Sequence, residues 1–327
     1  MNIGIWTTWG QRCGVAAYSQ NLARALCALG HTVSVVSNYP FDPVAPEELE
    51  HGSVAYCFTL PRDGQKQEFD FEKAKAQFKD CDGVVVQYQS SIHWKEPFFT
   101  FIRSIEKPIV MVVHDDCVWP DLYPRIKGLD IEVVVHHSLL QGRGDTFLPF
   151  PSPAMLVQPT LRKYPPAPVQ PVLIRSFGFR TDDSVVRESA KLLQKEREGK
   201  VYYERLKSDE HWMPEETLQN FLDEATFVVL YYPPYANVFA SSAAALAASS
   251  GTPVLTSGAR CFEDYPFVTR CVSAEDLALH MQHLLLDKYE YWKNSSSAFG
   301  YASTYNFVAY ADVILRHFLL TKVQAEE

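Results

Sequence analysis

Hydrophobic and polar residues along the first 40 positions follow two different periods. Residues 3–6 are a short apolar run, which predicts a buried strand. Apolar residues then recur every three or four positions from Val15 to Leu29, the spacing of a helix with one buried face. Residues 32–36 are rich in valine and predict a second strand. A strand, a helix and a strand in this order form a parallel crossover, so the loop 7–14 lies at the carboxyl edge of the sheet.

The same alternation continues to the end of the chain. Further apolar runs, typical of parallel strands covered by helices on both faces, lie at 83–87, 108–113, 131–135, 172–177, 227–232 and 254–256. Helical patterns lie at 68–79, 97–105, 183–198, from about Pro214, at 241–250 and at 304–322. Eight of the 21 prolines lie between positions 149 and 171, where neither a helix nor a central strand fits. The pattern predicts two α/β domains, 1–160 and 161–303, and a terminal helix within 304–327.

Composition and charge agree with this organisation and narrow the class of protein. A length of 327 residues suits two domains, and 47% hydrophobic with 21% charged residues is ordinary for a globular protein. The net charge of −9 argues against a globally basic nucleic-acid binder, although charge can be segregated locally. The seven cysteines never form a CxxC pair, and neither a signal-peptide pattern nor an apolar run long enough to cross a membrane occurs. We therefore expect a cytoplasmic protein without a membrane span.

Two loops of the first domain could carry chemistry, because ligands of parallel sheets bind beyond the carboxyl ends of the strands. The loop 7–14 contains Arg12 and ends at Gly14 beside a helix N-terminus, which suits a phosphate; the alternative is a turn that simply needs a glycine. It is not GxGxxG, which disfavours a nicotinamide-dependent reductase. His114 and Asp115 follow a predicted strand and could exchange a proton with a ligand, or could be ordinary loop residues.

Other side chains near the same edge have competing interpretations. His93 and His137 also follow strands, but with His114 they lack the spacing of a metal site, so we predict no metal. The rings of four tryptophans could stack on a sugar or a base, or could pack the loops: Trp6, Trp9, Trp94 and Trp119.

The second domain offers two further loops. Gly178 and the flanking Arg175 and Arg180 could bind a diphosphate, while Asp182 and Asp183 add like charge or cap the next helix. Ser241 and Ser242 lie at the start of a predicted helix. They could offer an anion site or an ordinary serine cap.

The order of these segments resembles one known family. GVAAYSQNLARALCALGHTVSVVS from Gly14, then DGVVVQYQ, KPIVMVVHDD, VVVHHSLL, SFGF and SSAAALAASSGTPVLTSG, are similar to the successive signatures of family 4 glycosyltransferases. The resemblance implies the GT-B fold, in which two Rossmann-like α/β domains face each other across a cleft. It makes 1–160 the acceptor domain and 161–303 an abbreviated nucleotide-sugar domain, with 304–327 packing back on the first domain.

The resemblance also implies an activity and a site. It implies transfer of a sugar from a nucleoside-diphosphate sugar to an acceptor hydroxyl, with retention and without a metal or other cofactor. The donor contacts would be Gly14, Arg12, Gly178, Arg180, Tyr235, Asn237, Ser241 and Ser242. His114 and Asp115 would be catalytic, and Trp9, Tyr18, His93 and His137 would lie on the acceptor side. The acceptor could be a glycan, a small molecule or a hydroxylated base in DNA. Binding of DNA would need a basic rim, formed by Arg12, Arg143, Arg162 and Lys163.

Three departures from the family favour a second hypothesis. Val238 and Leu246 stand where the family carries paired glutamates, and Ser184 stands near the place of its lysine. The chain between residues 178 and 227 is also shorter than usual, by about one β-α unit. The alternative is a catalytically degenerate GT-B protein that acts in binding or as a scaffold.

Overall fold

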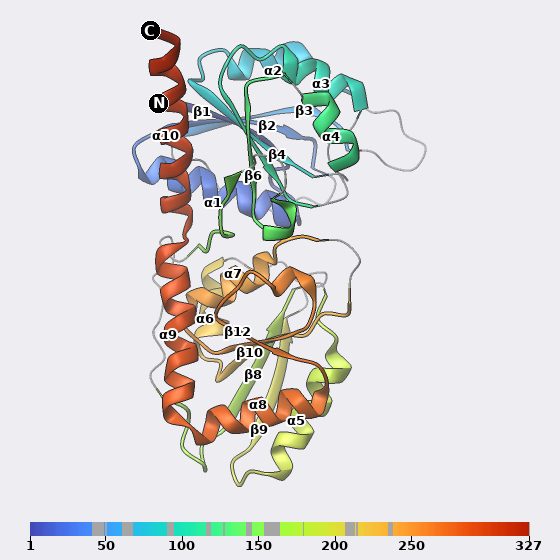
Figure 1. Cartoon of the computed structure of the whole chain (residues 1–327), viewed down its shortest axis with the longest axis vertical. Helices are drawn as coiled ribbons and strands as arrows, with labels where there is room; N and C mark the ends of the chain where they lie inside the picture. Colours follow the sequence, from blue (N-terminus) through green and yellow to red (C-terminus); the bar gives the residue numbers. More distant parts are fainter. Residues whose placement is uncertain are drawn as a thin grey trace. The chain divides into compact units, whose positions relative to one another are not determined.

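The chain folds into two compact units (Figure 1). The computed structural model describes residues 1–40, 49, 51–60, 68–89, 95–115, 119–126, 128–141, 146–153, 164–178, 180–206, 213, 215–234 and 238–326. The first unit comprises Met1–Pro149, Asn237–Phe239 and Phe307–Glu327, and the second comprises Phe150–Ala236 and Ala240–Asn306.

The first unit is built on a seven-stranded parallel sheet. Its strands are β1 (Asn2–Thr7), β2 (Thr32–Asn38), β3 (Gly52–Phe58), β4 (Gly83–Tyr88), β5 (Ile109–Val113), β6 (Ile131–Val135) and β7 (Thr146–Phe147). In the order β3-β2-β1-β4-β5-β6-β7, β2 and β3 lie on one side of β1, and the later strands β4 to β7 lie on its other side. Such a reversal places the loops after β1 and β4 on either side of one crevice at the carboxyl edge.

Helices cover both faces of this sheet. They are α1 (Gly14–Ala28), α2 (Phe71–Phe78), α3 (Lys95–Arg103), α4 (Trp119–Ile126), the short helix η2 (Ser138–Leu140) and α10 (Phe307–Glu326). Trp6 lies in the core with residues of α2 and α3, and its ring stacks on Phe58 at 4.9 Å between centroids. On the other face, α1 packs against α10.

One glycine shows how closely α10 approaches the sheet. A Cβ built on Gly83 at the start of β4 would lie only 2.6 Å from the Phe318 ring of α10. Phe318 is 1% exposed, so its ring occupies the space that a larger residue in β4 would need. The terminal helix is therefore part of the core of the first unit and not an appendage.

The second unit has a five-stranded parallel sheet of order β12-β11-β10-β8-β9. Its strands are β8 (Val172–Phe177), β9 (Val201–Leu206), β10 (Phe227–Leu230), β11 (Val254–Ser257) and β12 (Val268–Cys271). Its helices are α5 (Asp183–Lys195), α6 (Glu215–Asp223), α7 (Ser242–Ser249), η3 (Arg260–Phe262), α8 (Ala274–Leu286) and α9 (Lys288–Thr304). α5 packs against α8, and α7 packs against α9.

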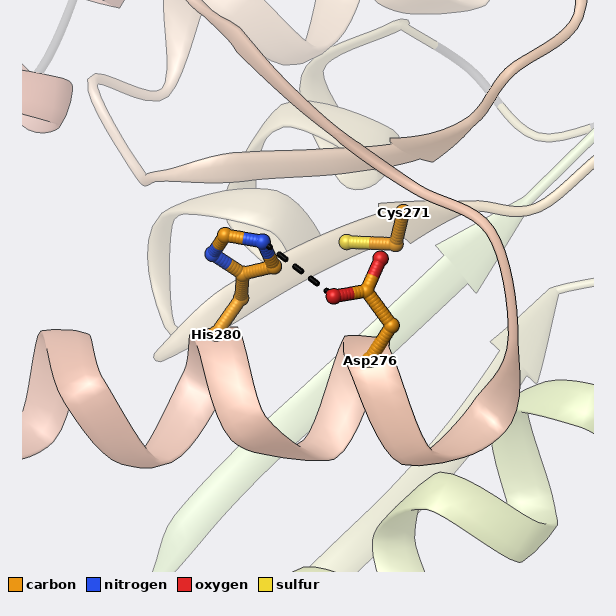
Figure 2. Close-up of side chains that lie close together, drawn as sticks. All are labelled: Cys271, Asp276 and His280. Carbon is orange, nitrogen blue, oxygen red and sulfur yellow. Dashed lines mark ion pairs between the residues drawn. The ribbon is translucent and has the colours of Figure 1, made fainter.

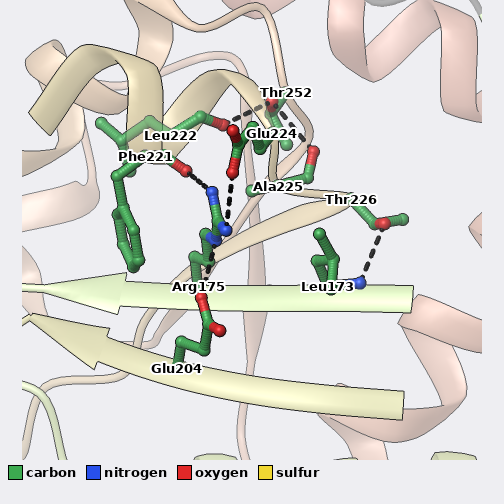
Figure 3. Close-up of polar contacts among 9 residues, drawn as sticks. All are labelled: Leu173, Arg175, Glu204, Phe221, Leu222, Glu224, Ala225, Thr226 and Thr252. Carbon is green, nitrogen blue, oxygen red and sulfur yellow. Dashed lines mark hydrogen bonds and ion pairs between the residues drawn. The ribbon is translucent and has the colours of Figure 1, made fainter. Parts of the chain in front are cut away.

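A buried arginine fastens α6 to this sheet (Figure 3). The side chain of Arg175 is 8% exposed and pairs with Glu204 at 3.1 Å and Glu224 at 2.9 Å. Its guanidinium also donates to the Phe221 carbonyl in the last turn of α6, where helix carbonyls lack intrahelical partners. Arg175 is thus a structural residue, and the hypothesis that it binds a diphosphate is wrong.

The two parallel α/β sheets confirm the fold class expected from the hydrophobic pattern. The terminal helix expected within residues 304–327 corresponds to α10, while α9, which precedes it and is separated from it by Tyr305 and Asn306, was not expected. No helix in the described ranges combines the length and the apolar character needed to cross a bilayer.

Candidate active site

Four polar side chains gather at the carboxyl edge of the first sheet. Gln87 is the penultimate residue of β4, His114 follows β5, and His136 follows β6. Tyr18 reaches the same place from the second turn of α1. Neighbouring parallel strands end side by side, so residues far apart in sequence meet here.

Tyr18 and His136 are bound to each other within this group. The Tyr18 hydroxyl lies 2.8 Å from His136 Nε2, and His136 Nδ1 lies 2.8 Å from the Leu148 carbonyl oxygen. A carbonyl only accepts, so we assign the proton to Nδ1, and Nε2 accepts from the tyrosine. Burial lowers the pKa of His136 to about 4 and raises the pKa of Tyr18 well above its usual value. Both groups stay neutral near pH 7, and the pair has a positioning role.

His114 has a different environment. It is half-buried, its Nε2 lies 2.8 Å from Gln87 Oε1, and its ring stands edge-on to Tyr18 at 5.1 Å between centroids. With Oε1 as the acceptor, the neutral ring carries its proton on Nε2 and is basic at Nδ1. The Gln87 amide nitrogen is fully buried and has no hydrogen-bond partner among the residues that the structure describes. A buried donor without a partner costs free energy, so this amide is suited to a ligand oxygen.

Of the other residues expected on the acceptor side, Trp9 and His137 have structural surroundings. Trp9 is 1% exposed and Trp6 lies in the core, so neither ring offers a face for stacking on a ligand. His137 is buried and caps η2, where its Nδ1 accepts from the Leu139 amide. Asp115 is partly buried next to His114. His93, Trp94 and the side chain of Trp119 lie outside the described residues.

The loop after β1 is anchored and leads into α1. Gln11 is buried and accepts from the Asn38 side-chain amide at 2.9 Å, and Gly10 has a positive φ of 61°. Cys13, the N-cap residue of α1, makes no side-chain capping hydrogen bond, and the first turn has no acidic residue. A Cβ built on Gly14 would meet nothing within 4 Å. The half-buried Arg12 is next to this uncapped helix N-terminus, whose amides can bind an anion.

The second unit has a polar network at the carboxyl ends of β8 and β9. Gly178 has a φ of 89°, a conformation that favours glycine, and its carbonyl accepts from Arg205 Nη2 at 3.3 Å. Arg205 also pairs with Asp183 at 3.1 Å, and the Tyr203 hydroxyl donates to the same carboxylate at 2.5 Å. The negative charge of the Asp183 carboxylate is therefore balanced by Arg205. The expected capping role holds for Asp182, which accepts from the Ser184 amide at 3.0 Å.

The start of α7 differs from the start of α1. Ser241 is the N-cap residue, and its buried hydroxyl accepts from the Ala244 amide at 3.3 Å. Its own amide donates to the Cys261 carbonyl at 3.3 Å, so the expectation that this amide serves a phosphate is wrong. Ser242 is exposed in the first turn, and Arg180 is exposed after β8. Tyr235 and Asn237 lie outside the described residues, as do Arg143, Arg162 and Lys163 of the expected basic rim.

Four residues of these networks were absent from the sequence-based site. Gln87 gave a signal, since an amide inside an apolar strand must be paired or functional. His136 is next to His137 in the sequence, and only the structure shows which of the two contacts Tyr18. Tyr310 of α10, whose ring lies 6.0 Å from Tyr18, and Arg205 of β9 come from elements that no local pattern connects to the site.

One hollow among the described residues lies away from these groups. It has a volume of about 500 Å³ and is lined by residues before β4, β5 and β6, including Asp82, Lys107 and Asp130. This is the amino edge of the sheet, whereas ligands of such sheets bind at the carboxyl edge. We therefore base the candidate site on the strand ends and not on this hollow.

Comparison with known proteins identifies the fold. No known family model and no curated protein sequence matches the chain. Among solved structures, Anabaena Alr3699/HepE with UDP and glucose matches at a TM-score of 0.60 and 11% identity, over 98% of this chain and 99% of that one. An alpha-glucosyltransferase with UDP and a mismatched 13-mer DNA gives 0.59 and 12%, over 96% and 100%. MurG of Acinetobacter baumannii gives 0.55 and 10%, over 96% and 99%. At such identities the likeness is one of fold, and the chain has the GT-B fold of two Rossmann-like units.

Proposed function

We propose that this protein is a glycosyltransferase that moves a sugar from a nucleoside-diphosphate sugar to an acceptor hydroxyl. The single observation that carries the proposal is the pairing of His114 with Gln87 at the strand ends, next to a buried amide without a partner. Two other features support it: the uncapped N-terminus of α1 with open space at Gly14, and a GT-B fold shared with glycosyltransferases.

The residues of the site suit the charges that such a reaction develops. As the bond between the sugar and the diphosphate breaks, negative charge grows on the phosphate oxygens, and free helix amides with Arg12 can stabilise it. The Gln87 amide would donate to a hydroxyl near the reacting carbon. His114 Nδ1 would accept a hydroxyl proton, and Asp115 next to it would favour the charged ring. In the second unit, Gly178, Arg180, Arg205 and Ser242 are the candidates for donor binding.

The finer features of the reaction are part of the proposal. We propose retention of configuration without a metal ion or cofactor, on the resemblance of the sequence segments to family 4 enzymes. One structural neighbour is an alpha-glucosyltransferase solved with UDP and a DNA 13-mer containing a HMU base. A hydroxylated base in DNA therefore joins a glycan and a small molecule as a candidate acceptor. We propose a cytoplasmic location, where nucleotide sugars are available.

A screen of nucleotide sugars tests this function. UDP-glucose and other UDP-, GDP- and ADP-sugars are added at millimolar concentration, and the melting temperature is followed. At 100 times the dissociation constant a donor adds about 2.7 kcal/mol of stability, which is a rise of several degrees. A donor that stabilises the protein is then incubated with cell extract or hydroxymethylated DNA, and release of the nucleoside diphosphate is measured. Absence of a shift with every donor would contradict the proposal.

A degenerate binding protein is the second candidate function. Val238, at one position of the family's paired glutamates, is buried, and Leu246 occupies the other. The Ser241 amide and hydroxyl are both used inside the unit. Substitution His114→Ala separates the two functions. An enzyme loses turnover while it keeps its fold, whereas a scaffold retains partner binding and shows no turnover even before the substitution.

A further inference from the structure

Three side chains with metal-binding groups converge at the far edge of the second sheet (Figure 2). Cys271 is the last residue of β12, and α8 begins three residues later. Asp276 and His280 are four residues apart on α8, so they lie on the same side of the helix. The thiol sulfur, a carboxylate oxygen and an imidazole nitrogen all lie within 4.8 Å of one another.

The distances suit coordination better than direct hydrogen bonding. His280 Nε2 and Asp276 Oδ1 are 3.4 Å apart, which is long for a charge-assisted hydrogen bond. Two ligand atoms of a tetrahedral zinc site, each about 2.0–2.1 Å from the ion, lie about 3.3 Å apart. The carboxylate is held in place by its other oxygen, since Asp276 Oδ2 accepts from the Val272 amide at 2.9 Å. The His280 side chain is 41% exposed, so its rotation can bring the ring nitrogen closer to the Cys271 sulfur.

The charges around the group favour a cation. The first turn of α8 carries two acidic residues, Glu275 and Asp276. In the part of the chain that the structure describes, His280 is the sole basic residue paired with Asp276.

We propose that Cys271, Asp276 and His280 bind a divalent metal ion of the zinc type, with a fourth position open to water. A thiolate, an imidazole and a carboxylate together select a borderline-soft ion such as Zn²⁺ and not Mg²⁺ or Ca²⁺. On binding, the thiol releases its proton to solvent and sulfur bonds to the metal, with no change of oxidation state. The ion joins the end of β12 to α8. This site is independent of the proposed sugar transfer.

Cobalt binding tests the site directly. Co²⁺ is titrated into the reduced protein, and the near-ultraviolet charge-transfer band from thiolate to cobalt is recorded. We expect a band that saturates at about one ion per chain, displacement by Zn²⁺, and release of about one proton per ion at pH 7. Mg²⁺ should displace nothing. Absence of the band in the unmodified protein would overturn the proposal.

Matched variants assign the ligands. Cys271→Ser should abolish the band, and His280→Ala should weaken Co²⁺ binding at least about tenfold. Two control variants should leave the titration unchanged: His283→Ala, an exposed histidine on the same helix, and Cys27→Ser in the first unit. Because His280 is partly exposed, His280→Ala tests the site even where Cys271→Ser lowers stability. An unchanged titration in both ligand variants would assign the metal elsewhere and refute the site.

Discussion

His114 and His136 follow neighbouring strands, but their surroundings give them different properties. Both ring nitrogens of His136 are engaged, by Tyr18 and by the Leu148 carbonyl, and the ring is 3% exposed. His114 is half-buried, and its pairing with Gln87 fixes which nitrogen is basic. At the scale of single residues, burial and hydrogen bonding thus separate a positioning histidine from one that can exchange a proton.

Substitution of His114 should therefore remove chemistry and spare the fold. In a transfer assay with the donor identified by the screen, His114→Ala should lower kcat at least about 100-fold, as expected for loss of a general base. The melting temperature should stay within a few degrees of that of the unmodified protein, since the ring lies at a strand end. A variant that retains more than a tenth of the turnover would exclude His114 as the base.

His136 should make the stability of the first unit depend on pH. An unfolded histidine has a pKa of about 6.5, while burial lowers the folded pKa to about 4. Between these values the unfolded chain binds a proton that the folded protein does not. The free energy of unfolding is therefore not reduced by His136 above about pH 6.5. It falls as the pH is lowered towards 4, by about 3 kcal/mol in all.

Urea unfolding at pH 7 and pH 5 measures this effect. The unmodified protein should lose about 2 kcal/mol more than His136→Gln, which can still accept from Tyr18 and donate to Leu148. Other groups that titrate in this range act equally in both proteins, so the difference reports on His136. Equal losses would show that His136 is not buried in the neutral form.

How far a residue's role follows from sequence depends on how local its partners are. His114 was found because a histidine directly after an apolar run must lie at a strand end. Ser241 was also correctly placed at a helix start, yet its amide proved to be engaged by Cys261, which is distant in sequence. Trp9 gave no local sign of burial. Partners brought together by tertiary packing are not encoded in any window of neighbouring residues.

At the level of secondary-structure elements, a single substitution tests whether the N-terminus of α1 binds the donor phosphate. A Cβ on Gly14 meets nothing within 4 Å, so Gly14→Ala should leave the melting temperature unchanged or slightly higher. If a phosphate lies against this turn, the added methyl group should weaken binding of the nucleotide sugar at least about tenfold.

Gly30, just beyond the other end of α1, provides the matched control. It also has open space around its Cβ position, but its φ is +83°. Gly30→Ala should cost about 1 kcal/mol of stability and leave donor affinity unaltered. Unchanged affinity in Gly14→Ala would remove α1 from the donor site.

Elements with two buried faces were predictable, and edge elements were not. The sequence predicted β1, β4, β5, β8 and β10 because their apolar runs are nearly continuous. β9 escaped detection because its burial alternates with exposure and its sequence VYYERL is half polar. β12 is short and polar on average. α9, with five buried residues among 17, has too little apolar periodicity for a clear pattern.

For the whole molecule, the order of strands and helices predicted two parallel α/β units. The chain leaves the first unit after Pro149 and, apart from Asn237–Phe239, returns to it at Phe307. A proline-rich segment shows where one unit can end, but no local property shows which unit the last helix joins. The unit that α10 joins is decided by shape complementarity: the glycine at the start of β4, for example, leaves room for the Phe318 ring of α10.

Because α10 supplies core residues, the first unit should not fold without it. Phe307, Tyr310, Ile314 and Phe318 are each at most 5% exposed, and loss of four such side chains costs about as much as the whole stability of a typical domain. A chain that ends at Asn306 should lose the cooperative urea transition of the first unit, read from protection of the β4 and β5 amides against hydrogen exchange. Amides of β8 and β10 in the second unit should stay protected.

A chain that ends at Leu320 is the control, since it keeps the buried positions of α10 and lacks only the last seven residues. Its exchange protection should match that of the full chain. Gly83→Ala offers a third measurement, because its methyl group would collide with Phe318 and should destabilise the first unit selectively. Retained protection of β4 and β5 in the Asn306 chain would mean that the fold of the first unit is complete within residues 1–149. In that case α10 would only cover it.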